Sequence, residues 1–455
     1  MNQEKGLAAR LSLMDAILLV IGSVVGSGIF LTSGIIAGAL PDAGLILLVW
    51  FFGMILILFG GLTLAELGTM MPEAGGHYVY LRKAYGPLAG FLFSWMWMLV
   101  VQTGGVAALS VGFAEYLSYF FPSLSLENYF INFSVLKISF GHMVAVLSIG
   151  LLTVVNYFGI KSGSILQNIF TIVKIIAIAI LVIAGLVLIA GSETSFSAGT
   201  ALPTPSGSAL WSAIGISLIA VLWTFDGWYA VNIVASEIKN VRRNLPLSLI
   251  IGILLTGIIY LLVNWFYIQS MPMSEMAGTV RIGEKSATAL FGQGFGGIMS
   301  GLILISIFGC LSATIIYGPR VFFAVAKDGL FFRAFAQVHP KYRTPSHAII
   351  WQGIWAAVLC LSGTYEQLYT YVIFVLLIFY IALGLAVIKL RKTSPDIERP
   401  YKVWGYPVVP VLFALAMFWI MINTLVEKPV ESMIGLFLVL TGLPIYFYWK
   451  NRSKA

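Results

Sequence analysis

The chain has 455 residues, of which 60% are hydrophobic and only 10% are charged, and its net charge is +8. Soluble domains carry about a quarter charged residues, so this composition excludes an ordinary soluble enzyme, and it is too apolar for a disordered chain. Two cysteines cannot form a disulfide scaffold. From the high hydrophobic and low charged fractions we predict an integral membrane protein.

About twelve segments are apolar and long enough to cross the hydrocarbon layer, which takes about 20 residues. The predicted spans are 12–39, 44–68, 88–120, 139–157, 163–190, 208–235, 246–269, 295–325, 347–362, 366–390, 407–426 and 430–449. The polar segment before the first span is short and no small-residue cleavage site follows the first apolar run. We therefore expect no removable signal peptide.

The distribution of basic residues predicts the orientation, because positively charged short loops stay in the cytoplasm. With the N-terminus inside, 21 of the 26 Lys and Arg residues fall in inside segments, four fall outside and one lies within a span. We therefore expect an even number of spans in the cytoplasmic membrane, with both termini cytoplasmic. The same asymmetry explains the net charge, so no nucleic-acid partner is expected.

The first predicted span is interrupted by Gly26-Ser27-Gly28, a run with low helix propensity. Non-helical backbone at bilayer depth is tolerated only where it is buried in protein or lines a cavity. Close packing of small residues against another helix would explain the same glycines. On this span alone, the two interpretations are equally supported.

The basic residue within a span is Lys174, in the fifth. An ammonium group at the centre of a membrane helix costs at least ~2.5 kcal/mol, so we expect it to have partners. A structural ion pair or hydrogen bonds to backbone carbonyls would suffice, although a transport role is favoured. That role would be a fixed positive charge where a sodium-coupled transporter binds Na⁺, or a lysine that releases its proton when desolvated.

The sixth span carries the second interruption, where Asp226 and Gly227 follow Trp223 past the middle of the bilayer. The chain divides into two five-span units and two trailing spans, and interrupted helices at corresponding positions of two halves indicate a transporter binding site. Trp223 could shield a substrate from one side. Asp226 either caps the second half of the broken helix or titrates, and capping is the favoured interpretation.

The ends of a broken helix have chemistry of their own. The second half begins with unpaired N–H groups, which attract a carboxylate, and the first half ends with unpaired carbonyls, which attract an ammonium group. A zwitterionic α-amino acid carries both groups on one carbon.

The four histidines show no metal spacing, Cys310 and Cys360 fit as packing residues within spans, and no nucleotide motif or catalytic triad is present. We expect no enzyme, no metal and no cofactor.

Several runs, in their order and spacing, resemble the L-type amino acid transporter family of the amino acid–polyamine–organocation superfamily. They include Gly26-Ser27-Gly28-Ile29-Phe30, Pro72-Glu73-Ala74-Gly75-Gly76, Phe225-Asp226-Gly227-Trp228, Arg243-Asn244-Leu245-Pro246, Lys327-Asp328-Gly329 and Arg399-Pro400-Tyr401. The resemblance implies an all-α, LeuT-like fold with discontinuous first and sixth helices. Its single domain, 1–455, would contain two inverted five-span repeats, 12–190 and 208–390, and two additional spans, 407–449.

The resemblance also implies roles for individual residues. Those expected to bind the substrate are Ser27 and Gly28, through their N–H groups, their neighbour Ile29, and Val24, Trp223 and Asp226, through their carbonyls. Trp223 would also be an aromatic gate. Lys174 would link the break in the first span to Ser312 on the eighth, and Tyr260 on the seventh span would support the same break.

Two departures from the family limit these expectations. Animal members pair with a glycoprotein through a cysteine in the loop between the third and fourth spans, but residues 121–138 contain none, so no disulfide-linked heavy chain is expected. The tenth span offers apolar and aromatic groups and no acid, which favours neutral substrates, although Asp226 leaves cationic substrates open.

The sequence therefore predicts sodium-independent exchange of neutral L-amino acids. Proton-coupled symport is the first alternative, and a receptor or channel that binds amino acids without obligatory transport is the second.

Overall fold

The computed structural model describes residues 11–132, 137–158, 163–190, 203–342, 344–361 and 364–452. The segment before Leu11, and residues 133–136 of the loop without cysteine, lie outside these ranges. The first half contains α1 Leu13–Val24, α2 Gly28–Ala39, α3 Ala43–Met70, α4 His77–Tyr85, α5 Pro87–Met96, α6 Gln102–Leu117, α7 Phe140–Tyr157 and α8 Gly163–Ala190. A π-helical turn, Trp97–Val101, joins α5 to α6. The strands β1 Tyr129–Asn132 and β2 Lys137–Ser139 form an antiparallel hairpin.

The second half is also helical. It contains α9 Gly207–Thr224, α10 Ala230–Ile233, α11 Val241–Ser270, α12 Met273–Met276, α13 Ile282–Phe291, α14 Gln293–Tyr317, α15 Pro319–Lys327, α16 Ser346–Cys360, α17 Tyr365–Thr393, α18 Val408–Glu427 and α19 Pro429–Arg452. Polar caps fix several helix starts. The hydroxyl of Ser12 accepts a hydrogen bond from the Asp15 N–H at α1, and Thr364 caps α17 in the same way through Gln367.

Within the described residues, nine continuous helical segments are long and apolar enough to cross a membrane, and the bent pair α1 and α2 makes up to ten. The bend between these two helices is 45°. The two remaining predicted spans correspond to α8, in which Phe170–Gly185 is an apolar helical segment, and to α16, an apolar helix of 15 residues. The chain is thus a multi-pass, largely helical membrane protein. The count of twelve and the inverted repeat stay predictions.

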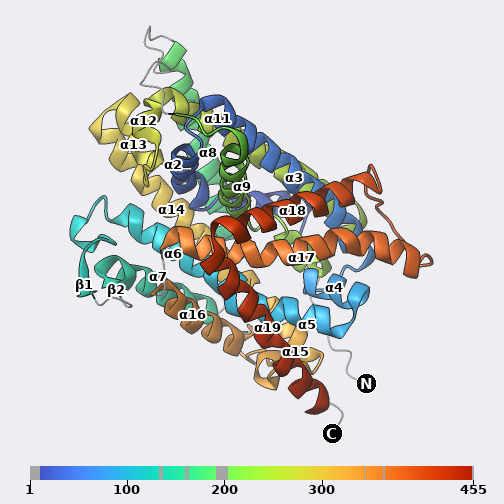
Figure 1. Cartoon of the computed structure of the whole chain (residues 1–455). Coiled ribbons are helices and arrows are strands. Elements are labelled where there is room, and N and C mark those ends of the chain that lie inside the picture. The colour runs from blue at the N-terminus through green and yellow to red at the C-terminus, as the bar shows by residue number, and fades with distance from the viewer. Residues whose placement is uncertain are drawn as a thin grey trace.

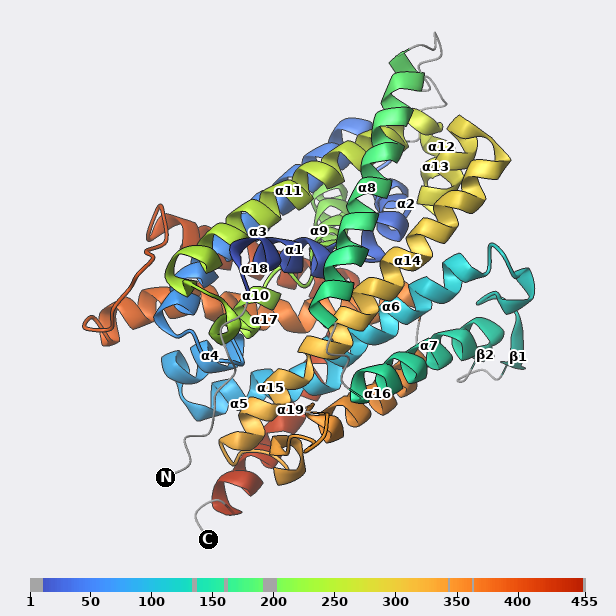
Figure 2. The ribbon, with the colours of Figure 1, turned by 180° about the vertical axis from the view of Figure 1, so that it is seen from behind.

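Both views of the ribbon show two distinct ends (Figures 1 and 2). The helices α4, α5 and α15 and the last turns of α19 gather at one end, and α12, α13 and the β hairpin lie toward the other. The helices α4, α15 and α19, which contain Arg82, Arg320 and Lys450, thus share one end. That this end is cytoplasmic stays a prediction.

Candidate functional site

The interruption of the first span is found where the glycines predict it. The helix α1 ends at Val24 and α2 begins at Gly28. A Cβ atom on Gly28 would lie only 2.7 Å from the hydroxyl oxygen of Thr224, so this position requires glycine for the close approach of α9. By helix geometry, the first N–H groups of α2, at Gly28 and Ile29, have no acceptor within the helix. The break therefore provides backbone donors beside the end of α9.

The sixth span is also interrupted. The helix α9 ends at Thr224, and a turn leads to α10. Gly227 lies in this turn with φ of 94°, and a Cβ atom there would lie 2.9 Å from the Ser23 carbonyl oxygen, so the two breaks are in direct contact. The carbonyl of Trp223 accepts a hydrogen bond from the Asp226 N–H at 2.9 Å. One of the two predicted carbonyls of this break is thus already bonded to backbone.

Asp226 does not cap the second half of the broken helix. The residue in the N-cap position of α10 is Tyr229, and it makes no side-chain capping bond. The carboxylate of Asp226 instead accepts a hydrogen bond from the Tyr229 hydroxyl, 3.0 Å from Oδ1. The favoured interpretation of the sequence was wrong because α10 starts four residues after Asp226, so the carboxylate lies too far from the helix start.

One tyrosine hydroxyl joins the two breaks. The oxygen of Tyr260, on α11, lies 3.1 Å from the carbonyl oxygen of Val24 and 3.1 Å from that of Thr224. Its ring is fully buried and packs edge-on against Phe225 and Trp50. The last carbonyls of both first half-helices therefore share one hydroxyl donor, at the position that the sequence predicts for Tyr260.

Lys174 reaches the break in the first span. Its ammonium group donates hydrogen bonds to the carbonyl oxygens of Gly22 at 2.8 Å and Val25 at 2.6 Å. From the eighth span, the thiol of Cys310 donates to the Ser23 carbonyl at 3.3 Å. Among the described residues no hydrogen bond joins Lys174 to Ser312. Residues two apart on a helix do not share a face, so the structure places Cys310 where the sequence predicts Ser312.

The predicted gate residue contacts the tenth span. The indole N–H of Trp223 donates to the Tyr365 hydroxyl oxygen at 2.8 Å, and that hydroxyl lies 3.0 Å from the hydroxyl of Ser27. The ring of Trp223 also stacks on Tyr369, with centroids 6.0 Å apart. Tyr365 thereby connects α2, α9 and α17. Sequence reasoning missed it, although Tyr365 and Tyr369 lie four residues apart on one helical face.

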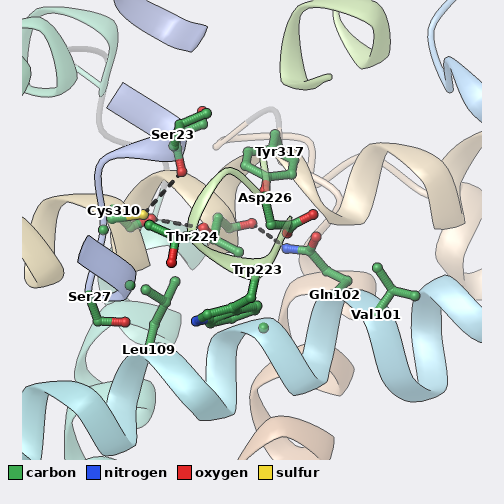
Figure 3. A pocket seen from close by; sticks show the side chains of 15 residues that line it. Ser23, Ser27, Val101, Gln102, Leu109, Trp223, Thr224, Asp226, Cys310 and Tyr317 are labelled. Atoms are coloured by element: carbon green, nitrogen blue, oxygen red, sulfur yellow. Dashed lines mark hydrogen bonds between the residues drawn. The ribbon is translucent and has the colours of Figure 1, made fainter. Parts of the chain in front are cut away.

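A cavity lies between the two breaks and two further helices, α6 and α14 (Figure 3). Of the predicted site residues, Val24, Ser27, Gly28, Trp223 and Asp226 line it, whereas Ile29, Lys174, Tyr260 and Ser312 do not. Sequence reasoning missed the lining residues of α6 and α14, which are Gln102, Gly105, Leu109, Cys310, Thr314 and Tyr317. The available sequence signal was the polar side chain of Gln102 within an apolar span. In the structure Gln102 directly follows the π-helical turn, and such turns often mark functional sites.

The cavity combines polar and apolar groups. The amide of Gln102 donates to the Thr314 carbonyl oxygen at 2.6 Å, which ties α6 to α14 at the cavity wall. Leu109 and the indole of Trp223 provide apolar surface (Figure 3). Within the part of the chain that the structure describes, no three His, Cys, Asp or Glu residues are grouped so as to hold a metal ion. The groups around the cavity can bind both charged ends of a small zwitterion through backbone and can cover its side chain.

Comparisons with known proteins cover nearly the whole chain. The family model described as amino acid permease matches residues 11–444. The serine/threonine exchanger SteT of Bacillus subtilis is 32% identical over 460 residues, which cover 100% of both chains. The b(0,+)-type amino acid transporter 1 of Homo sapiens is 31% identical over 97% of this chain and 88% of its own length. The large neutral amino acids transporter small subunit 2 of Mus musculus is 30% identical, over 99% and 83%.

Proposed function

This chain belongs to the amino acid permease family, and from that premise we propose that it moves neutral L-amino acids across the cytoplasmic membrane by sodium-independent exchange. The substrate carboxylate would be held by the N–H groups at the start of α2. Its ammonium group would face the carbonyls that end α1 and α9. Alternating access would follow from rocking of one group of helices against another around this fixed site.

The observation that carries the proposal is the position of Lys174. In transporters with broken helices, coupling ions are coordinated by unwound carbonyls and by the C-terminal ends of half-helices. Here the ammonium group of Lys174 already donates to two such carbonyls, those of Gly22 and Val25. A fixed positive charge at this place supplies the attraction that a sodium ion would otherwise provide. It therefore supports a cycle that needs no sodium.

Exchange, rather than net uptake, is supported by the relatives. SteT is named an exchanger of serine and threonine, and the match covers both chains completely. For this chain we propose neutral substrates, since Trp223 and Leu109 line the cavity and the carboxylate of Asp226 is bonded to Tyr229. A single-chain transporter is proposed as well, because the loop 121–138 contains no cysteine for a linked heavy chain.

Counterflow in proteoliposomes tests the proposal. Vesicles are preloaded with serine, threonine, alanine, leucine or arginine, or left empty, and uptake of each labelled amino acid is measured in sodium and in potassium buffer. We expect uptake that requires a preloaded neutral amino acid and is the same in both buffers. Concentrative uptake into empty vesicles, driven by an imposed pH gradient, would instead establish proton symport. Exchange of arginine would show that Asp226 admits a cationic side chain, and binding without flux would indicate a receptor.

A further inference from the structure

The segment 391–406, which runs from the last turn of α17 to the residue before Pro407 and α18, is held by a buried carboxylate. Glu66, on α3, is 0% exposed. Its two carboxylate oxygens accept hydrogen bonds from Arg391, at 2.9 Å from Nε and 2.7 Å from Nη2. The backbone N–H of Val403 donates to the same carboxylate at 2.7 Å. One acidic side chain thereby anchors both the beginning and the end of the segment.

A second arginine holds the segment from within. The guanidinium group of Arg399 lies against Glu66, with Nε 3.6 Å from Oε1. Its terminal nitrogens donate to four backbone carbonyls, those of Leu390, Ser394, Pro395 and Ile397. The guanidinium of Arg391 also stacks on the ring of Tyr406, 3.7 Å from its centroid. Charge-assisted hydrogen bonds of this kind fix a loop in one conformation.

An aromatic ring and basic groups are exposed on this segment and on the last turns of α17. Trp404 is 77% exposed. Lys392 and Lys402 are exposed, and Lys389, one turn before Lys392, is exposed with its ammonium 4.7 Å from the Tyr85 ring centroid. No ion-pair partner of these three lysines is found within the described ranges. A large indole that is held outside the protein by a rigid loop indicates an interacting surface.

The neighbouring surface identifies what this loop faces. The helix α18 begins at Val408, which is 59% exposed, and Leu412 and Leu415 are exposed on the same helical face. In a membrane protein such a face lies against lipid. Trp404 precedes Val408 by four residues, so we expect it where the hydrocarbon layer meets the headgroups. Tryptophan is enriched at this depth, and juxtamembrane lysines attract anionic lipids.

We propose that the segment 391–406, together with Lys389, is a binding site for anionic phospholipid headgroups. The indole of Trp404 lies in the headgroup region, and Lys389, Lys392 and Lys402 bind the phosphate groups. Glu66, Arg391 and Arg399 hold the segment that carries Lys392, Lys402 and Trp404. This site is separate from the transport cavity and goes beyond the proposed transport function.

Native mass spectrometry of the full chain in detergent tests the proposal, with phosphatidylglycerol and phosphatidylcholine added as probes. We expect the protein to bind phosphatidylglycerol more tightly. The triple variant Lys389→Gln, Lys392→Gln, Lys402→Gln should weaken that binding roughly tenfold or more. A matched triple variant, Lys83→Gln, Lys239→Gln, Lys341→Gln, removes the same charge from other exposed positions and should change the dissociation constant less than about twofold.

The single variant Trp404→Ser should weaken binding of both lipids, because it removes the interfacial ring. The variant Trp211→Ser, which removes another exposed indole at the start of α9, is its control. All replaced side chains are exposed, and an unchanged melting temperature verifies the fold. Equal losses in the two triple variants, or no preference for phosphatidylglycerol in the parent protein, would overturn the proposal. Displacement of the lipid by an equal concentration of glycerol phosphate would overturn it too, since the site would then bind free phosphate.

Discussion

The ammonium group of Lys174 donates a 2.6 Å hydrogen bond to the carbonyl oxygen of Val25, the first residue after α1. The two residues lie 149 positions apart in the chain, so this bond joins α8 to the break in the first span. A helix end buried in a membrane protein needs donors for its last carbonyls. Lys174 supplies them and places a positive charge beside the cavity without lining it.

Replacement of Lys174 by Ala should therefore reduce amino acid exchange severely, to roughly a tenth or less, because two buried carbonyls lose a charged donor. The amount of protein in the membrane should stay within about a factor of two of the parent. Initial exchange rates in proteoliposomes, normalised to protein content, measure the effect. Lys137→Ala, which removes an exposed lysine from the β hairpin, is the matched control. Unchanged exchange in Lys174→Ala would contradict the role.

The role of the Tyr260 hydroxyl can be tested against a matched control, because α11 carries a second buried tyrosine, Tyr267. The hydroxyl of Tyr260 lies within hydrogen-bonding distance of the Val24 and Thr224 carbonyls, whereas that of Tyr267 has no partner among the described residues. Tyr260→Phe should lower thermal stability by about 1 kcal/mol and slow exchange. Tyr267→Phe should leave both unchanged or raise stability, because it removes an unsatisfied polar group. Equal effects of the two substitutions would exclude the proposed coupling of the breaks.

The location of the breaks could be predicted from the sequence, whereas their contacts with the eighth and tenth spans could not. Gly28 and Gly227 mark the interruptions because a Cβ atom there would lie under 3.0 Å from Thr224 and from the Ser23 carbonyl oxygen. The full-length matches confirm the resemblance to amino acid transporters. The eighth-span contact depends on rotation of α14 about its axis, which periodicity does not fix to within one residue, and Cys310 rather than Ser312 faces the break. Likewise, no local sequence pattern predicts the contact between Trp223 and Tyr365, which are 142 residues apart in the chain.

The contact between Trp223 and Tyr365 gives a prediction about occlusion. Tyr365→Phe removes the oxygen that accepts the indole N–H and lies beside the Ser27 hydroxyl. We expect the KM for exchange to rise roughly five- to tenfold, which is the effect of losing about 1 kcal/mol of closed-state stability. Tyr371→Phe, on the same helix as Tyr365 and only partly buried, should behave like the parent protein.

Trp223→Ala should weaken substrate selectivity. Unaltered uptake of every amino acid by Trp223→Ala would argue against a gate.

The environment of His77 predicts a pH dependence of stability. It lies at the start of α4, between the segments that qualify as membrane spans, and is 1% exposed. Its ring packs against Phe93 and Tyr229, and neither ring nitrogen has a hydrogen-bond partner among the described residues. Burial lowers the pKa of His77 from 6.5 to about 3, because the charged imidazolium would be desolvated. The folded protein therefore keeps this imidazole neutral.

Below pH 6.5 the unfolded chain binds a proton at His77 that the folded protein does not bind, so this residue destabilises the fold as the pH falls from 6.5 toward 3. Between pH 7 and pH 5 the loss is about 2 kcal/mol. His77→Phe keeps an aromatic ring in the aromatic cluster and should remove this part of the pH dependence. Melting temperatures in detergent from pH 7 to pH 5 measure it, with His347→Phe, at an exposed position, as the control. If His77→Phe lost stability as steeply as the parent protein over that range, His77 would not be the titrating group.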